Sequence, residues 1–356
     1  MSSLGPSRRR AAAVLPGALA TITLAACGGG SSSDGASGGE PGTAPDINGD
    51  GKVVIGVLSP GDINDRGYYQ GFVDEADAFA KEQGWEIIKR GSVDPADGLT
   101  AARALCQQKV DMVALAASEL KDAVPASEEP VCKDTVFYTQ SSANIEQTPR
   151  VIISSDDPTP SIFATGYAAG LKLVETGGTK AGFVTGEKAD FSVAASEAFI
   201  AGIRQLVPDA TLVTTYTGDF DDSAKAKEAV QAQVSQGVNI VYPYLGGATD
   251  AAAAAAQEGG AMTLTPGTDR CDSTDPKFDV SAIFSPGAFF RISLEEFAKD
   301  NLEVGTTRNW KIGVDKYPTV KLCDASEESN TKLQTFLADM GADKIDAAAE
   351  VERLKD

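Results

Sequence analysis

Cysteine is the residue type whose chemistry and spacing say most about this chain of 356 residues. Four cysteines lie in the body of the chain, and four cysteines allow two disulfides by three different pairings. The pairs nearest in sequence, Cys106–Cys132 and Cys271–Cys323, are favoured. The alternatives are four buried free thiols, or a four-cysteine zinc site, which the absence of any C-x2-C spacing disfavours.

The fifth cysteine, Cys27, follows a basic start at residues 8–10, an apolar run over residues 11–26 and the small residues Ala25 and Ala26. These are the parts of a secretory signal, and the run is too short to span a membrane. A cysteine at the cut resembles the lipobox of bacterial lipoproteins, in which the thiol carries diacylglycerol. We therefore expect a lipoprotein signal peptide over 1–26, lipidation of Cys27, and a protein anchored by lipid at the extracytoplasmic face of the cell membrane. The alternative is an ordinary signal peptide with a chance cysteine.

The segment after Cys27 is made almost entirely of Gly, Ser, Ala, Asp, Pro and Thr. A stretch of this composition has little apolar surface to bury, so it stays extended and flexible. The sequence predicts a flexible tether over 27–50 between the lipid and the folded body.

Charge and composition exclude several classes of protein. The chain has 31 Lys and Arg residues against 51 Asp and Glu residues, a net charge of −20, and no histidine. An acidic surface disfavours binding to nucleic acid. The absence of histidine removes the commonest general base and the commonest metal ligand. We expect no catalytic residues, no metal site and no cofactor, and hence a protein that is not an enzyme.

Apolar strands alternate with amphipathic helices along the body, which indicates parallel sheets with helices on both faces. The alternation runs through two similar α/β halves, about 52–155 and 160–270, and is followed by a tail of mixed elements. Strands are expected at 52–58, 85–89, 110–116, 135–138, 151–153, 181–185, 211–216, 238–244, 261–265, 280–284 and 310–314. Helices are expected at 67–83, 99–108, 119–124, 161–176, 193–206, 224–236, 249–258, 289–300 and 327–354.

Several short motifs occur in a recognisable order over roughly residues 52 to 320. They are the stretch 56–72 with Asp65-Arg66-Gly67-Tyr68, the helix segment 164–170, the strand end 182–186, the segment 199–203, the loop 216–222 and Gly267-Thr268-Asp269. Behind a lipobox, this order resembles the basic membrane protein family of solute-binding lipoproteins, which includes purine nucleoside receptors of ABC importers.

The resemblance implies an α/β protein of the type 1 periplasmic-binding-protein fold, in which two doubly wound parallel-sheet lobes are joined by a hinge. The first lobe is expected at 51–156 plus about 286–308, and the second at 157–285 plus about 309–356. The implied role is to capture a small solute in the cleft between the lobes and to deliver it to ABC permease and ATPase subunits. We expect a monomer.

The resemblance also implies that two aromatic rings, Tyr68 and Phe220, hold the solute between them. Both lie in loops after strands, where ligands of open α/β sheets bind, and each ring that stacks on a flat solute contributes about 1–3 kcal/mol. The alternative for Tyr68 is a ring packed on its own lobe. Asp269 matches a family aspartate that accepts hydrogen bonds from ribose, although a turn role suits it nearly as well.

The chain departs from the family at other positions of the implied site. Ser59, Tyr69 and Gln140 stand where the family has an aspartate, an asparagine and an aspartate, and Ala288 stands where it has a lysine. Further lining candidates at strand ends are Gly246, Ser118, Glu119, Thr185, Glu187 and Tyr244. These exchanges replace family contacts to the purine nucleoside, whereas the stacking pair is kept. We therefore expect a small polar cyclic or aromatic solute that is nucleoside-like, without naming it. A ligand-sensing receptor domain and a sugar-binding protein of the same fold are the alternatives.

Overall fold

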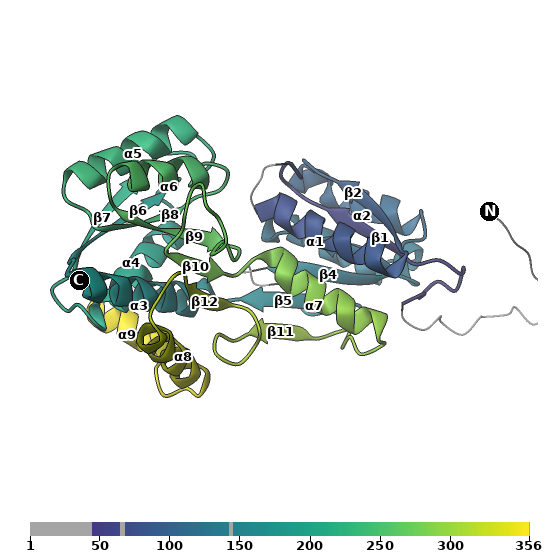
Figure 1. Ribbon diagram of the computed structural model, residues 1–356. Helices are drawn as coiled ribbons and strands as arrows, with labels where there is room; N and C mark the ends of the chain where they lie inside the picture. The colour runs from purple at the N-terminus through teal and green to yellow at the C-terminus, as the bar shows by residue number, and fades with distance from the viewer. Residues whose placement is uncertain (1–44, 65–67, 142–144, 356) are drawn as a thin grey trace, which may run out of the picture. The chain divides into compact units, whose positions relative to one another are not determined.

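The computed structural model describes residues 45–64, 68–141 and 145–355 (Figure 1). The predicted signal peptide, Cys27 and most of the predicted tether lie outside the described residues. Within the described ranges, no helix is both long and apolar enough to cross a membrane.

The end of the predicted tether belongs to the folded body, because a buried carboxylate holds it. Asp111 is fully buried, and its Oδ1 accepts hydrogen bonds from the backbone N–H groups of Ile47 and Asn48 at 2.8 and 3.3 Å. Its Oδ2 accepts from the N–H of Val54 at 2.8 Å. Ile47 also packs against the core. The predicted tether boundary at residue 50 is therefore too late, because this carboxylate fixes residues that composition alone marks as flexible.

The first sheet has six strands, all parallel, in the order β11-β5-β4-β3-β1-β2. Its strands are β1 (Val54–Leu58), β2 (Glu86–Arg90), β3 (Met112–Leu115), β4 (Val136–Ser141), β5 (Val151–Asp156) and β11 (Thr307–Trp310). The α-helices around it are α1 (Tyr68–Gln83), α2 (Gly98–Cys106) and α7 (Pro286–Ala298), and the 3-10 helices are η1 (Pro95–Asp97), η2 (Ser118–Glu128) and η3 (Pro130–Cys132). We call these elements the first lobe.

The second sheet has six strands in the order β12-β10-β9-β8-β6-β7. Its strands are β6 (Lys180–Thr185), β7 (Thr211–Tyr216), β8 (Ile240–Tyr244), β9 (Met262–Gly267), β10 (Val280–Ile283) and β12 (Thr319–Leu322). The helices around it are α3 (Pro158–Thr176), α4 (Asp190–Arg204), α5 (Ser223–Ser235), α6 (Thr249–Glu258), α8 (Glu327–Gly341) and α9 (Ala347–Leu354). We call these elements the second lobe.

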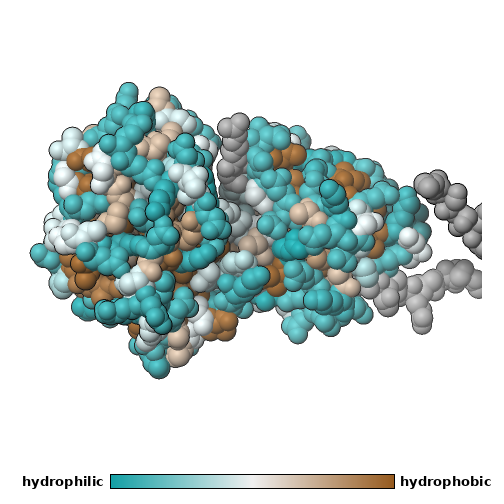
Figure 2. All heavy atoms as spheres, viewed as in Figure 1, coloured by the Kyte–Doolittle hydropathy of each residue, from teal (hydrophilic) through white to brown (hydrophobic). Residues whose placement is uncertain are grey.

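The continuous apolar runs of the strands are explained by burial on both faces of each sheet. In β1, Val54 and Leu58 face the cluster that includes Leu105 of α2. Ile55 and Val57 face the opposite cluster, which is covered by α1 and α7. In Figure 2, the visible surface is mostly hydrophilic, with hydrophobic residues in small separate patches.

The chain passes from one sheet to the other three times, after β5, after β10 and after β11. As a result, the tail of the sequence is divided between the two lobes. Helix α7 and strand β11 join the first lobe, and β12, α8 and α9 join the second. Each disulfide stays within one lobe: the structure joins Cys106 to Cys132 and Cys271 to Cys323.

The sequence-based expectations fail mainly in this tail. The strand expected at 310–314 lies at 307–310, and β12 at 319–322 was not expected. β12 runs antiparallel to β10, so the second sheet is not wholly parallel. It is a short edge strand whose buried residues alternate with polar ones, so it lacks the apolar run that marks the other strands. The helix expected over 327–354 is two helices, because the chain turns between Gly341 and Asp346.

Helices α3 and α4 approach each other closely because each has a glycine at the contact. A Cβ atom on Gly166 would lie 2.1 Å from the carbonyl oxygen of Phe199, and one on Gly202 would lie 2.0 Å from that of Phe163. These are backbone atoms, so no side-chain rotation can relieve the overlap. The start of α3 is fixed by Asp157, whose carboxylate accepts a hydrogen bond from the N–H of Thr159 at 2.9 Å.

We predict that Gly166→Ala destabilises the protein by about 1–3 kcal/mol, because the added methyl group overpacks this contact. Gly71→Ala is the matched control, since Gly71 also lies within a helix but its added Cβ would be 3.7 Å from the nearest atom, Ser285 Oγ. The control should be neutral or slightly more stable, because alanine favours helix by about 1 kcal/mol. Urea unfolding measures both, and equal effects would contradict the prediction.

Candidate functional site

Tyr68 and Tyr69 are the first two residues of α1, the helix that follows β1 and its loop. The ring of Tyr69 lies against Gly61, where an added Cβ would be 2.2 Å from the ring carbons. The Tyr69 hydroxyl donates to Glu119 Oε1 at 3.2 Å. Tyr68 packs edge-on against Tyr69, with ring centroids 5.5 Å apart, and remains 44% exposed. Tyr69 thus supports the partly exposed ring of Tyr68.

Ser59 follows β1 directly and is fully buried. Its hydroxyl donates to the carbonyl oxygen of Gly61 at 3.1 Å, and its backbone carbonyl accepts from the N–H of Val93. Ser59 therefore shapes the loop on which Tyr69 rests.

Gln140 lies near the carboxyl end of β4 and is 5% exposed. Its Oε1 accepts from the Tyr138 hydroxyl at 2.9 Å and from Ser154 Oγ at 2.7 Å. Ser154 Oγ in turn accepts from the indole N–H of Trp310 at 2.8 Å. Burial raises the pKa of Tyr138, which therefore stays protonated and able to donate. We call Trp310, Ser154, Tyr138 and Gln140 the donor chain.

Phe220 lies in the loop between β7 and α5 of the second lobe. Its ring covers Gly186, where an added Cβ would be 2.6 Å from the ring. It stacks on Phe191, with centroids 6.1 Å apart and planes 21° apart. Phe191 itself is 52% exposed. The second lobe therefore presents two rings at the carboxyl ends of β6 and β7.

Gly246 is tied to the same loop. Its N–H donates to the carbonyl oxygen of Phe220 at 3.0 Å, and an added Cβ would lie 2.6 Å from Asp221 Oδ1. The same carboxylate oxygen accepts from the N–H of Gly247 at 2.5 Å. A side chain at 246 would displace Asp221, so this glycine helps to hold the Phe220 loop in place.

Asp269 follows β9 and already has protein partners. Its Oδ2 pairs with Lys321 Nζ at 2.9 Å, and its Oδ1 accepts from the N–H of Cys271 at 3.1 Å. Burial alone would raise the pKa of Asp269, but the hydrogen bonds from Lys321 and Cys271 outweigh it and lower the pKa. A solute hydroxyl at Asp269 would have to compete with Lys321.

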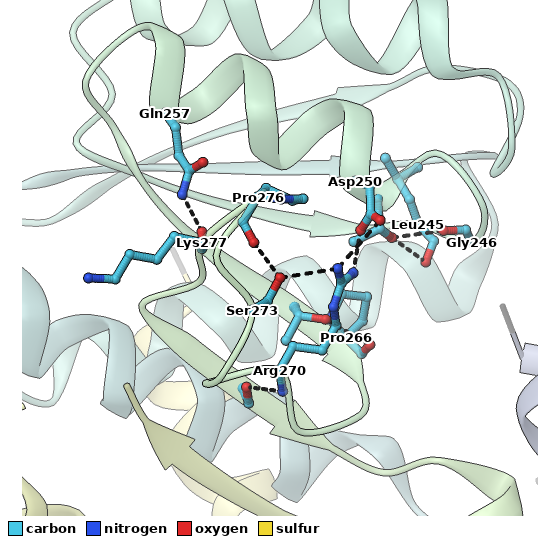
Figure 3. Close-up of polar contacts among 12 residues, drawn as sticks. Leu245, Gly246, Asp250, Gln257, Pro266, Arg270, Ser273, Pro276 and Lys277 are labelled. Atoms are coloured by element: carbon cyan, nitrogen blue, oxygen red, sulfur yellow. Dashed lines mark hydrogen bonds and ion pairs between the residues drawn. The ribbon is translucent and has the colours of Figure 1, made fainter. Parts of the chain in front are cut away.

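The loop between β9 and β10 is held by a second set of polar contacts (Figure 3). Arg270 forms an ion pair with Asp250 of α6, and its guanidinium lies 4.6 Å from the centroid of the Phe278 ring. Ser273 Oγ donates to the carbonyl oxygen of Pro276 at 2.7 Å. With the Cys271–Cys323 disulfide, these contacts fix the loop that carries Asp269.

Two surface hollows in the first lobe are lined by none of these residues. One of about 470 Å³ is lined by Lys121, Asp122, Val124, Pro125, Glu128, Ile145, Glu146 and Thr148. The other, of about 340 Å³, is lined by Ile152, Ser293, Glu296, Asn301, Leu302, Glu303, Thr306, Thr307 and Arg308. Neither lining includes an aromatic ring, so the loops that carry Tyr68, Phe220 and Gln140 remain the better candidate.

Sequence reasoning missed three residues of this site. Phe191 could have been found, because it begins the helix after β6 just as Tyr68 begins the helix after β1. Ser154 and Trp310 gave no such signal, because their role depends on the pairing of β5 with β11. That strand was expected over 310–314, so that Trp310 would begin it, whereas Trp310 ends β11.

Two lobes with parallel-dominated sheets, three connections and aromatic rings at strand ends define a solute-binding protein. Residues 52–335 match the family model described as ABC transporter substrate-binding protein PnrA-like. The chain belongs to this family, whose members bind transport substrates and are not enzymes.

Solved structures share the fold. An ABC transporter solute-binding protein from Conexibacter woesei DSM 14684 is 18% identical with a TM-score of 0.68, covering 83% of this chain and 98% of that chain. A solute-binding protein from Aeropyrum pernix K1 is 18% identical with a TM-score of 0.63, covering 85% of this chain and 90% of that chain.

A relative found by sequence is the CD4+ T-cell-stimulating antigen of Listeria innocua. It is 25% identical over 231 residues, which are 64% of this chain and 61% of that relative's length.

We predict that Asp269→Asn lowers stability fully above the ordinary carboxyl pKa of about 3.9, and progressively less as the pH falls below it. Because the folded-state pKa of Asp269 is lowered, its contribution is present at neutral pH and is lost as the pH falls through that lowered value. The ion pair is partly exposed, so the effect at pH 7 should stay below about 1 kcal/mol. Lys321→Gln should reproduce it in urea unfolding at pH 7 and pH 3, and a difference that is independent of pH would contradict the prediction.

Proposed function

We propose that this protein is a lipid-anchored, extracytoplasmic receptor of an ABC importer that captures a small nucleoside-like solute between its lobes. The observation that carries the proposal is the presence of supported aromatic rings at strand carboxyl ends in both lobes. The exposed ring is Tyr68 in the first lobe and Phe191 in the second, and Phe191 stacks on Phe220, which is half-buried against the core of its lobe. Ligands of open parallel sheets bind at such ends. A flat ring held between aromatic faces buries apolar area on both sides.

The other candidate residues take different parts in this proposal. Gln140 offers a polar group to the edge of the solute, and Asp269 offers a carboxylate if the solute displaces Lys321. Ser59, Tyr69 and Gly246 hold the two aromatic loops in place. The loaded receptor then delivers its solute, as a monomer, to permease and ATPase subunits in the membrane.

A thermal-shift screen of nucleosides, bases, sugars and polyols tests the ligand class. A solute at one hundred times its dissociation constant adds about 2.7 kcal/mol to stability, which raises the melting temperature measurably. Shifts with nucleosides or bases support the proposal. Shifts with sugars or polyols alone would favour a sugar-binding protein of the same fold.

We predict that Tyr68→Ala and Phe220→Ala each weaken binding of the solute found in that screen by about ten- to a hundredfold, because each removes one stacking face. Val174→Ala is the control, since Val174 is 56% exposed on α3 and belongs to neither loop. Isothermal titration calorimetry measures all three, and unchanged affinity in both aromatic variants would show that the rings do not hold the solute.

We predict that Cys27→Ala moves the protein from the membrane fraction to the soluble fraction, because the thioether to lipid can no longer form. Cell fractionation followed by immunoblotting measures the distribution. Retention of the variant in the membrane fraction would contradict the lipid anchor.

Uptake of labelled solute by cells with the gene deleted separates a role in import from a role in ligand sensing. Lost uptake supports import, and intact uptake supports sensing.

A further inference from the structure

The hydrogen bonds of the donor chain fix which end of the Gln140 amide accepts and which end is left to donate. An indole N–H can only donate, so Trp310 donates to Ser154, and Ser154 uses its single hydrogen on Gln140 Oε1. The Tyr138 hydroxyl, kept protonated by burial, gives its hydrogen to the same oxygen. Two donors therefore occupy the amide oxygen, and the amide nitrogen is turned away from them.

The amide nitrogen is the part of Gln140 that is open to a ligand. Among the residues that the structure describes, none accepts a hydrogen bond from Gln140 Nε2, although the residue is only 5% exposed. Gln140 Nε2 is not among the described buried side-chain atoms that lack a partner, so this nitrogen reaches solvent and is open to an acceptor atom of a solute. Gln140 lies at the carboxyl end of β4, in the sheet that also carries the Tyr68 loop after β1.

We propose that Gln140 donates its amide N–H to an acceptor atom on the edge of the bound ring, so that the site selects solutes with a ring acceptor over those with a ring N–H there. This inference rests on the proposed nucleoside-like ligand. A carboxylate at this position would have the opposite preference, because it can only accept. The glutamine, held by Tyr138 and Ser154, thus sets which edge of a planar solute is read.

Adenosine and inosine are matched probes, because the ring nitrogen at position 1 is an acceptor in adenosine and an N–H donor in inosine. In the full chain at pH 8, calorimetry should show adenosine bound about tenfold more tightly than inosine, as expected for one hydrogen bond at a desolvated site. This comparison needs no variant, so it stands even where a substitution impairs folding.

Gln140→Glu then reverses the polarity with little change of shape. One carboxylate oxygen can keep the hydrogen bonds from Tyr138 and Ser154, and the other replaces the donating nitrogen with an acceptor. The variant should lose about tenfold in affinity for adenosine and bind inosine at least as well as adenosine. Gln83→Glu, at the exposed end of α1, controls for the added charge.

The outcomes separate this inference from the proposed function. Equal or tighter binding of inosine by the wild-type chain would overturn the inference and leave the nucleoside-like ligand in place. A preference for adenosine that survives in Gln140→Glu would also overturn it, because another residue would then read the edge. Binding of neither nucleoside would overturn the proposed ligand class and this inference together.

Discussion

The parallel direction of the strands is the constraint on which the rest of this structure depends. Every strand of the first sheet runs the same way, and only the edge strand β12 departs from this order in the second. The loops that follow parallel strands therefore gather at one edge of each sheet. The candidate residues lie at these strand ends or in the loops that follow them. They are Ser59, Tyr68 and Gln140 in the first lobe, and Gly186, Phe220 and Gly246 in the second. Burial of both faces of each sheet stabilises this arrangement.

The crossings between the sheets add residues that a single βα series could not supply. Strand β11 comes from the tail of the chain, yet it pairs with β5 and brings Trp310 to Ser154. In this way a residue near the last crossing fixes the hydrogen bonding of Gln140, which lies 170 positions earlier in the printed sequence. The polarity of the candidate site is thus a property of the whole first lobe.

The sequence allowed the fold class, the family and most elements to be predicted, because apolar runs and amphipathic helices are strong local signals. Tyr68 and Phe220 could be proposed because an apolar ring in a polar loop is conspicuous. β12 could not be predicted, since a short alternating edge strand such as Thr319–Leu322 resembles a polar loop. The ion pair of Asp269 with Lys321 and the donor chain could not be predicted either, because both join elements that lie far apart in sequence.

A crystal structure of the protein with the solute from the ligand screen tests the central claim most directly. The account predicts a planar solute in van der Waals contact with Tyr68 on one face and Phe220 on the other, with an acceptor atom within hydrogen-bonding distance of Gln140 Nε2. A solute that touches only one of the two rings would contradict it, as would one seated in the hollow between Lys121 and Thr148.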